Sequence, residues 1–396
     1  SILTPMPYII ETATGFPEHY YPQEVLEVNI RNHCANLLQD YCRENHLDFQ
    51  EQTFFDLEQI HRFFSNVKIQ GRYFTIPLDE FDADNPPGIA QPFRQMVDLT
   101  MDLVTSTVTN LLKKAALSPK EISLVTSVTV LPSVPSLESL LLNRLDFSLD
   151  IKRQALSGVG CLGGAQGLAR VNDYLQGHPT EAAILFTTDP SSGLWQGSIH
   201  SDLTELLGQL PEDPSQYSNI IMTLVVAALF GDGVGTVLLA GDEHPLVKQG
   251  KAKLKIIGTQ SLLMPHTEHL MALPLTDYGF RQILRPEVSD YVKGGVRKAV
   301  TSLLEKTGVS LEEIVCWMVH PGGPKILDAI VEEFQLEPDI LQVSWDILAE
   351  IGNIASATIL CILDETLSRP HPPTGSYGLI ISMGPGFAQE AILVQF

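Results

Sequence analysis

The chain has 396 residues, of which 44% are hydrophobic and 18% charged, and its formal net charge is −22. This length and apolar content predict a well-buried globular protein made of two similar or fused domains. The anionic balance argues against nucleic acid or an anionic membrane as a partner. No stretch approaches the ~20 apolar residues that cross a bilayer, and the first residues carry no signal pattern, so we expect a cytoplasmic protein.

The cysteines are few and widely spaced: Cys34, Cys42, Cys161, Cys316 and Cys361. An odd number of cysteines without a Cys-x-x-Cys pair argues against a disulfide framework and against a zinc site. We therefore expect reduced thiols, no metal and no resident cofactor.

The first half of the chain predicts an alternation of helices and strands. Residues 1 to about 20 predict irregular structure. Helical spacing of apolar residues covers 24–47, 54–66, 92–116 and 162–175. Short apolar runs predict strands over 122–130, 151–156, 182–187 and 235–240. The polar, acidic segment 198–219 lies between two apolar segments, which predicts an insertion or lid outside the core.

The second half repeats this alternation. It predicts helices over 292–306, 325–334 and 354–366, and strands over 314–319, 377–382 and 391–395. Two halves rich in βαβ units indicate a duplicated α/β architecture with a site between the halves. We place the boundary after residue 240, giving units of 1–240 and 241–396.

Three loops of small residues each carry one reactive side chain. Cys161 lies in Gly-Val-Gly-Cys-Leu-Gly-Gly, His320 in Val-His-Pro-Gly-Gly-Pro-Lys and Asn353 in Gly-Asn-Ile-Ala-Ser-Ala. A thiol can carry an acyl group as a thioester, while an imidazole and a carboxamide can hold an oxyanion. Cys161 is expected where a strand meets a helix N-terminus, and that position predicts a lowered thiol pKa.

Two further motifs, Leu229-Phe-Gly-Asp-Gly and Met383-Gly-Pro-Gly-Phe, complete a set of five in a fixed order. From about residue 60 to the end, this set resembles the chalcone synthase-like type III polyketide synthases of the thiolase superfamily. The resemblance implies a thiolase-like α/β fold, in which two βαβαβαββ halves stack as five αβαβα layers. It also implies a homodimer.

The resemblance implies a role for each motif. Cys161 would accept the starter acyl group, and His320 and Asn353 would bind the extender thioester and stabilise its enolate. Phe230 and Phe280 match gatekeepers between the site and the substrate tunnel. The loop that shapes the cyclisation cavity matches Gly384, Pro385, Gly386 and Phe387.

In a homodimer of this family each subunit lends a loop residue to its neighbour's cavity, here from near Leu131 and Pro132. Glu138 lies close to that loop. Some condensing enzymes of the superfamily use a glutamate of the partner subunit to deprotonate an acyl α-carbon, a role that we consider for Glu138 without favouring it.

The sequence departs from the family in the basic cluster that holds the coenzyme A phosphate. Only Arg62 remains of that cluster, because Gln59 and Asn66 replace the other two cations. We therefore expect an acyl carrier protein to deliver at least one substrate, docking on Arg62, Lys68 and Arg72. Asp189, where the family often has glutamate, is a second departure.

The leading hypothesis is a type III polyketide synthase that uses acyl- and malonyl-coenzyme A thioesters and gives a β-keto product cyclised to an α-pyrone. One alternative is a ketosynthase that joins two chains bound to acyl carrier proteins without iterative extension. The other is an inactive homologue that serves as a binding scaffold.

Overall fold

The computed structural model describes residues 3–80, 90–370 and 372–396. Within these ranges the main sheet has nine strands in the order β13-β14-β15-β8-β1-β7-β6-β4-β5. The first half of the chain supplies β1 Tyr8–Gly15, β4 Leu124–Thr129, β5 Lys152–Ser157, β6 Ala182–Thr188 and β7 Val234–Ala240. The second half supplies β8 Leu254–Leu263, β13 Ile314–Val319, β14 Tyr377–Gly384 and β15 Ala388–Gln395. The two sets of strands join only where Tyr8 and Ile9 pair with β8.

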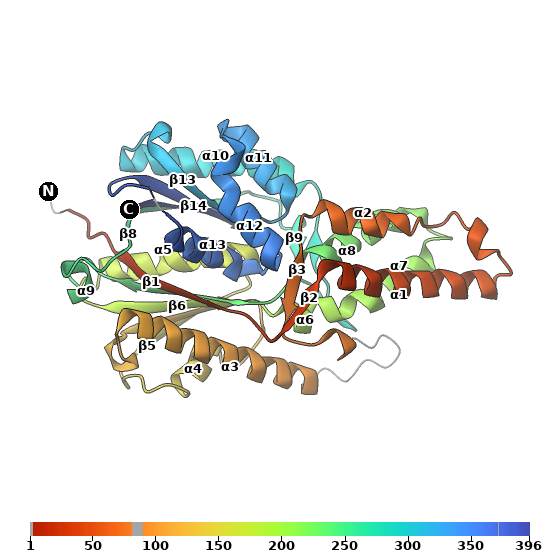
Figure 1. The fold of residues 1–396 in the computed structure, drawn as a ribbon, viewed down its shortest axis with the longest axis horizontal. Coiled ribbons are helices and arrows are strands. Elements are labelled where there is room, and N and C mark those ends of the chain that lie inside the picture. Colours follow the sequence, from red (N-terminus) through yellow and green to blue (C-terminus); the bar gives the residue numbers. More distant parts are fainter. Residues whose placement is uncertain (1–2, 81–89, 371) are drawn as a thin grey trace.

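The strands and helices stack as five layers (Figure 1). The bounds of the layer helices are α3 Ala90–Ala115, α5 Gly163–Gln176, α10 Val288–Thr307, α11 Pro324–Phe334 and α13 Thr358–Ser368. Helix α3 covers the outer face of the first set of strands, and α10 with α11 covers that of the second. Helices α5 and α13 lie between the two sets and contact both. This arrangement is the predicted αβαβα stack.

A helical lobe projects from one end of the layers (Figure 1). It is built from α1 Gln23–Glu44, α2 Glu58–Asn66, α7 Ile199–Gln209 and α8 Tyr217–Leu229. The prediction of a lid over 198–219 is wrong, because α7 buries Leu203, Leu206 and Leu207 in the core of this lobe. The acidic residues that suggested a lid lie mainly on the outer side, and the buried Asp202 is neutralised by Arg281 at 2.8 Å.

The prediction that residues 1–20 are irregular is also wrong. They contain β1, a central strand that pairs with β7 along its whole length. Glu11 interrupts the run of apolar residues in this strand, so the sequence pattern did not indicate a strand. The carboxylate is tolerated because Lys253 approaches it to 2.6 Å, and a buried charge needs such a partner.

The remaining elements are short or connect the layers. They are β2 His19–Pro22, β3 Gly71–Phe74, α4 Leu137–Leu142, α6 Ser191–Leu194, α9 Pro245–Lys248, β9 Met271–Ala272, β10 Leu275–Thr276, β11 Gly279–Phe280, β12 Ile283–Leu284 and α12 Gln342–Ile351. Of these, α6, β9 and β12 lie next to residues that line the cavity at Cys161, and α12 leads to Asn353.

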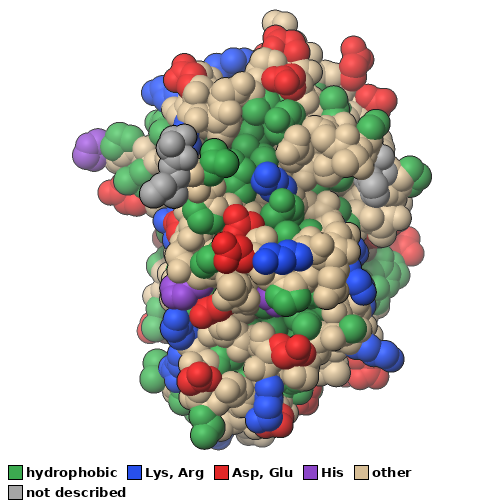
Figure 2. Space-filling view, turned by 90° about the vertical axis from the view of Figure 1, so that its left-hand side faces the viewer, with side chains coloured by type: hydrophobic (Ala, Val, Ile, Leu, Met, Phe, Trp, Pro, Cys, Tyr) green, Lys and Arg blue, Asp and Glu red, His purple; other side chains and the backbone are tan. Residues whose placement is uncertain are grey.

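On the face shown in Figure 2, lysine and arginine side chains are interspersed with acidic ones rather than gathered into one patch. In the described ranges no helix is both long and apolar enough to cross a membrane. The same residues contain no group of three or more His, Cys, Asp or Glu side chains arranged to hold a metal ion.

Candidate active site

Cys161 lies in a tight turn between β5 and α5. The turn contains a short 3-10 helix, Gly160–Leu162, directly before α5 begins at Gly163. Gly158 and Gly160 adopt positive φ values of 75° and 53°, which a residue without Cβ reaches at no steric cost. The sequence therefore places the thiol where it was predicted, at the end of a strand and before a helix.

The glycines after Cys161 allow its turn to pack against the loop that carries Asn353. A Cβ on Gly164 would lie 2.4 Å from the carbonyl oxygen of Ser356, and one on Gly163 would lie 2.3 Å from Val128. Both distances are far below any real contact, so larger residues would push the two loops apart. The Gly-Cys-Leu-Gly-Gly motif is thus a requirement for bringing the two loops together.

Asn353 is held by its backbone and by its own side chain. Its N–H donates to the carbonyl of Leu229 at 2.9 Å, and its carbonyl accepts from the N–H of Gly231 at 3.0 Å. The side-chain Oδ1 accepts the N–H of Ala355 at 2.9 Å, which fixes the orientation of the carboxamide. Cys161 Sγ lies 3.9 Å from the same Oδ1. Nδ2 is left as the group that can donate to a substrate.

His320 follows the last residue of β13. Its N–H donates to the carbonyl of Ile381 on β14 at 2.9 Å, so the neighbouring strand fixes its backbone. The side chain is 1% exposed, and neither ring nitrogen has a hydrogen-bond partner among the described residues. Buried polar atoms are nearly always paired, so two free nitrogens on one ring indicate a group reserved for a ligand.

Burial keeps this pair of groups neutral in the free protein. It raises the pKa of the Cys161 thiol to about 12, and the charge of Asp189 acts in the same direction. It lowers the pKa of His320 to about 3. The predicted lowering of the thiol pKa is therefore wrong, because loss of hydration outweighs the field of the helix N-terminus.

We expect alkylation of Cys161 by iodoacetamide to be slow at neutral pH and to accelerate as the pH rises well past 8.5. The thiolate is the reactive form, and a raised pKa moves its appearance to higher pH. The check is the labelling rate of the Cys161 peptide between pH 6 and 10.5, followed by mass spectrometry. A rate that levels off below pH 8.5 would contradict the neutral ground state.

The cavity next to Cys161 is small, about 20 Å³. Phe230 forms part of its wall, as predicted, and packs edge-on against Trp195 with ring centroids 5.2 Å apart. The other lining side chains include Val130, Met271, Leu273, Gln282, Ala355 and Pro385. This volume holds about one water molecule, so an acyl chain longer than a small starter requires side chains to move.

Four of the predicted cavity residues, Phe280, Gly384, Gly386 and Phe387, do not line this cavity. Phe280 does not line the cavity; it is partly buried against the core of the helical lobe. In the loop 384–387 only Pro385 reaches the cavity, where it contacts Gly160. Phe387 is fully buried in the core under α10, and Gly384 packs its backbone against Leu162. The motif matched, but the turn at Gly386 (φ 98°) directs Phe387 away from Cys161.

Two buried aspartates hold the walls of the site, and sequence reasoning gave neither this role. Asp189 accepts the N–H of Val130 at 2.7 Å and the N–H of Ser356 at 2.9 Å, so it ties one cavity wall to the Asn353 loop. Asp232 accepts the N–H of Thr75 at 2.7 Å. In the sequence, the only feature that drew attention to Asp189 was that the family often has a glutamate at this position.

The basic patch predicted from Arg62, Lys68 and Arg72 is only partly present. Arg72 is fully buried: its Nε donates to Gln23 at 3.0 Å and its Nη1 to the carbonyl of Phe230 at 2.7 Å. It therefore positions the gatekeeper backbone and cannot meet a carrier protein. Arg62 and Lys68 are exposed, and Arg62 lies 3.0 Å from Asp56.

Of the residues considered for a partner subunit's cavity, Glu138 and Leu131 are buried in their own chain, whereas Pro132 is exposed. Glu138 is 1% exposed and accepts from Ser127 at 2.7 Å, with Arg153 at 3.2 Å, so its carboxylate is a structural group. Leu131 is also buried in its own chain. In the same loop Val134 is 97% exposed, and Pro132 and Pro135 are exposed beside it, so this loop presents apolar side chains outward.

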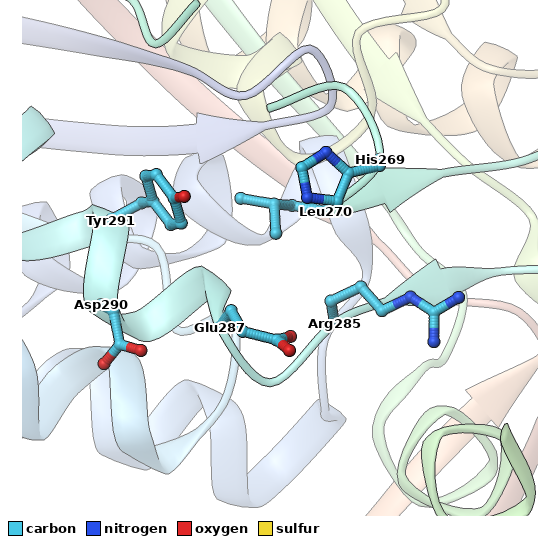
Figure 3. A pocket seen from close by; sticks show the side chains of 6 residues that line it. All are labelled: His269, Leu270, Arg285, Glu287, Asp290 and Tyr291. Carbon is cyan, nitrogen blue, oxygen red and sulfur yellow. The ribbon is translucent and has the colours of Figure 1, made fainter. Parts of the chain in front are cut away.

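A larger hollow of about 560 Å³ lies beside strands β9 and β12, away from the Cys161 thiol. His269 and Leu270 precede β9, and Arg285 follows β12, while Glu287 and Tyr291 come from the start of α10 (Figure 3). In Figure 3 the Glu287 carboxylate and the Arg285 side chain lie on the same side of the hollow. The hollow contains no cysteine, so its size does not make it the catalytic site.

Comparison with known proteins agrees with this geometry. Residues 255–396 match the family of chalcone and stilbene synthases, C-terminal domain, and residues 85–203 match the family of FAE1/type III polyketide synthase-like proteins. A 1,3,6,8-tetrahydroxynaphthalene synthase of Streptomyces peucetius subsp. caesius is 30% identical over 97% of this chain and 91% of its own. A putative chalcone synthase of Bacillus subtilis (strain 168) is 36% identical over 66% of this chain and 67% of its own.

Solved structures agree on the fold. The 1,3,6,8-tetrahydroxynaphthalene synthase of Streptomyces coelicolor A3(2) superposes with a TM-score of 0.77 at 21% identity, covering 98% of this chain and 99% of its own. A type III pentaketide synthase of Neurospora crassa gives 0.81 at 19% identity, with the same coverage of 98% and 99%. Since sequence likeness to the first bacterial synthase spans nearly both chains and these structures share the fold, the chain belongs to the chalcone synthase-like type III polyketide synthases.

Proposed function

We propose that the protein is an acyl-transferring ketosynthase that loads an acyl group on Cys161 and extends it by decarboxylative Claisen condensation. The observation that carries this proposal is a buried thiol and a fixed carboxamide that lie 3.9 Å apart, together with a buried His320 imidazole that has no hydrogen-bond partner among the described residues. Inactive homologues have no reason to keep such unpaired buried groups. The intact set therefore argues against the scaffold alternative.

In the loading step, neutral His320 takes the proton of the Cys161 thiol as its sulfur attacks the acyl thioester. A bond forms between Cys161 Sγ and the acyl carbon, and the thiolate of the donor thioester leaves. This thiolate takes up the proton from His320. His320 is neutral at physiological pH and can accept a proton, but its lowered pKa makes it a weak base in the free protein. Because both side chains are buried, the Cys161 thiolate and the His320 imidazolium form only once a substrate is bound. The substrate displaces water and brings its thioester carbonyl to the sulfur.

In the condensation step, a malonyl thioester loses carbon dioxide and leaves an enolate. The N–H of His320 and Nδ2 of Asn353 donate to the enolate oxygen. The enolate carbon attacks the acyl carbonyl on Cys161, the carbon–sulfur bond breaks, and a β-keto thioester is released from the cysteine. The small cavity favours short starters, and closure of the chain to an α-pyrone is the product that we propose. Neither cofactor nor metal takes part in these steps.

We retain homodimerisation and the boundary after residue 240 as part of the proposal. The exposed edge strand β5 and the outward-facing Val134 lie on the same part of the chain as the nucleophile turn. A cytoplasmic location remains our expectation from the composition.

A second candidate is that a carrier protein delivers an acyl group. The observation that favours it is the small number of groups that could bind the coenzyme A phosphate. Arg62 is paired with Asp56, and Gln59 accepts a hydrogen bond from the Tyr217 hydroxyl at 2.6 Å. One exposed, already paired cation binds a phosphorylated nucleotide weakly. A carrier docked nearby offsets weak affinity by raising the local concentration of its thioester.

For this candidate we expect carrier-bound acyl groups to reach Cys161 at least about tenfold faster than the same groups on coenzyme A. Arg62→Glu should slow the carrier route several-fold and change the slow coenzyme A route much less, because one exposed, paired cation adds little to nucleotide binding. Arg43→Glu, another exposed arginine beside an aspartate, serves as the matched control. Intact-protein mass spectrometry measures the acylated fraction over time. Equal or faster transfer from coenzyme A would leave the ordinary type III reaction as the function.

A further inference from the structure

A separate cavity of about 350 Å³ lies between the β2–β3 ribbon and helices α12 and α13. One wall is aromatic. Phe16 stacks on Tyr73 with ring centroids 4.9 Å apart, and Tyr20 tilts against Tyr73 at 4.8 Å. Tyr20 and Tyr73 are directly opposed in the β2–β3 pairing, so strand register holds both rings on one face. We call these three side chains the aromatic cage.

Two glycines allow the rings of the cage to lie against the backbone. A Cβ on Gly71 would lie 2.1 Å from the Tyr20 hydroxyl, and one on Gly233 would lie 3.2 Å from the Phe16 ring. Any larger residue at Gly71 would displace Tyr20 from the cavity. Phe16 and Tyr73 pack on one side against a hydrophobic core, and all three rings line the cavity.

The opposite wall is acidic. Glu350, from α12, forms no ion pair among the described residues, and Asp364 on α13 accepts only the neutral Thr12 hydroxyl, at 2.7 Å. Glu365 also lines the cavity but is paired with Arg369 at 2.9 Å. Across the described ranges, the lining contains no Lys, Arg or His side chain. Glu350 and Asp364 therefore leave the cavity with uncompensated negative charge.

We propose that this cavity binds a small organic cation, with a methylated ammonium group as the recognised part. The negative faces of aromatic rings attract a weakly hydrated ammonium, and carboxylates add a charge attraction at longer range. A calcium ion needs six to eight oxygen ligands, whereas this cavity presents aromatic rings and three carboxylates, one of which is paired with Arg369. The volume of about 350 Å³ accommodates a choline-sized ligand with room for its tail.

The cavity touches the helix that ends at the catalytic loop. Ile351 lines it and is followed by Gly352 and Asn353. A Cβ on Gly352 would meet the Leu229 carbonyl oxygen at 2.7 Å, so this junction is tightly packed. A bound cation is therefore expected to protect the amides of residues 345–353 from hydrogen exchange, and this readout requires no turnover.

The test is calorimetric titration of the whole chain with choline at constant ionic strength, sodium chloride being replaced as choline is added. The matched probe is 3,3-dimethylbutan-1-ol, which has the same shape without the charge. We expect saturable binding of choline at one site and binding at least about tenfold weaker for the neutral probe. Equal binding of both probes, or none up to about 50 mM choline, would overturn the proposal.

Two variants locate the site. Tyr20→Leu and Glu350→Gln should each weaken choline binding by about 5- to 30-fold, the range expected for one cation–π or charge contact. Both side chains are exposed, so we expect each variant to keep the fold. Circular dichroism of each variant checks that expectation. Tyr278→Leu and Glu44→Gln change equally exposed residues outside the cavity and should have no effect. Unchanged binding in Tyr20→Leu and Glu350→Gln would place the cation elsewhere and overturn the proposal.

Discussion

Cys161→Ala is expected to remove covalent loading completely and to reduce condensation by at least about 10⁴-fold. Loss of a nucleophile eliminates the covalent intermediate, and the remaining oxyanion donors accelerate only a much slower direct reaction. Intact-protein mass spectrometry after incubation with candidate acyl thioesters, carrier-bound and on coenzyme A, reports the adduct, and product formation reports the condensation.

Cys316→Ala is the matched control for this variant. Cys316 is partly buried on β13, and burial raises the pKa of its thiol to about 11, so it also stays neutral at pH 7. It lies outside the cavity lining and should load normally when replaced. An adduct on the Cys161→Ala protein would show that a different cysteine is the nucleophile.

Asn353→Asp is expected to keep loading within about threefold of the wild type while lowering condensation by ~10²–10³. The aspartate can still accept the N–H of Ala355, the 2.9 Å bond that fixes the side chain. It lacks the Nδ2 donor, and its charge repels the enolate oxygen. The variant therefore separates the role of Asn353 in catalysis from its role in the loop.

Single-turnover measurements distinguish the two steps in this variant. The rate of Cys161 acylation is measured by mass spectrometry, and the decay of the preloaded acyl-enzyme is followed after malonyl thioester is added. Thr358→Val reports what a disturbed loop alone does, because the Thr358 hydroxyl donates to the Ala355 carbonyl at 2.9 Å, accepts the Ile354 N–H at 3.0 Å and lies 3.4 Å from Asn353 Oδ1, while this variant keeps the Nδ2 donor. If acylation and condensation fell by the same factor in Asn353→Asp, Asn353 would be a structural residue.

The two steps also differ in what the tertiary structure contributes. In the proposed loading step Cys161 is the nucleophile and His320 moves its proton, and the glycine motif around Cys161 marks the nucleophile in the sequence. In the proposed condensation step His320 and Asn353 both donate to the enolate oxygen, and they come from loops more than 30 residues apart in the chain. Motif order predicted both donors. Their neutral state and the fixed orientation of the carboxamide depend on burial and on Ala355, neither of which is visible in the sequence.

The sequence by itself determined the alternation of strands and helices, because apolar spacing reports which face of an element is buried. It also determined the three reactive residues, since each lies in a motif of small residues. Most predicted elements are present, with ends shifted by a few residues. Two wrong predictions have a common cause: β1 carries Glu11 and α7 carries Asp202, charges that look exposed until a distant lysine or arginine neutralises them. Strand β8 and helix α12 were not predicted.

Tertiary structure alone decided the environment of the reactive groups. Arg72 appeared to be a surface cation, yet it is buried and its guanidinium pKa falls to about 9 because burial penalises its charge. Phe387 belongs to a matching motif, yet one glycine turn directs it into another core. The thiol of Cys161 follows a helix-terminus pattern, yet desolvation decides its pKa. Local sequence fixes which groups are present, whereas hydration and pairing depend on residues that only the fold brings near.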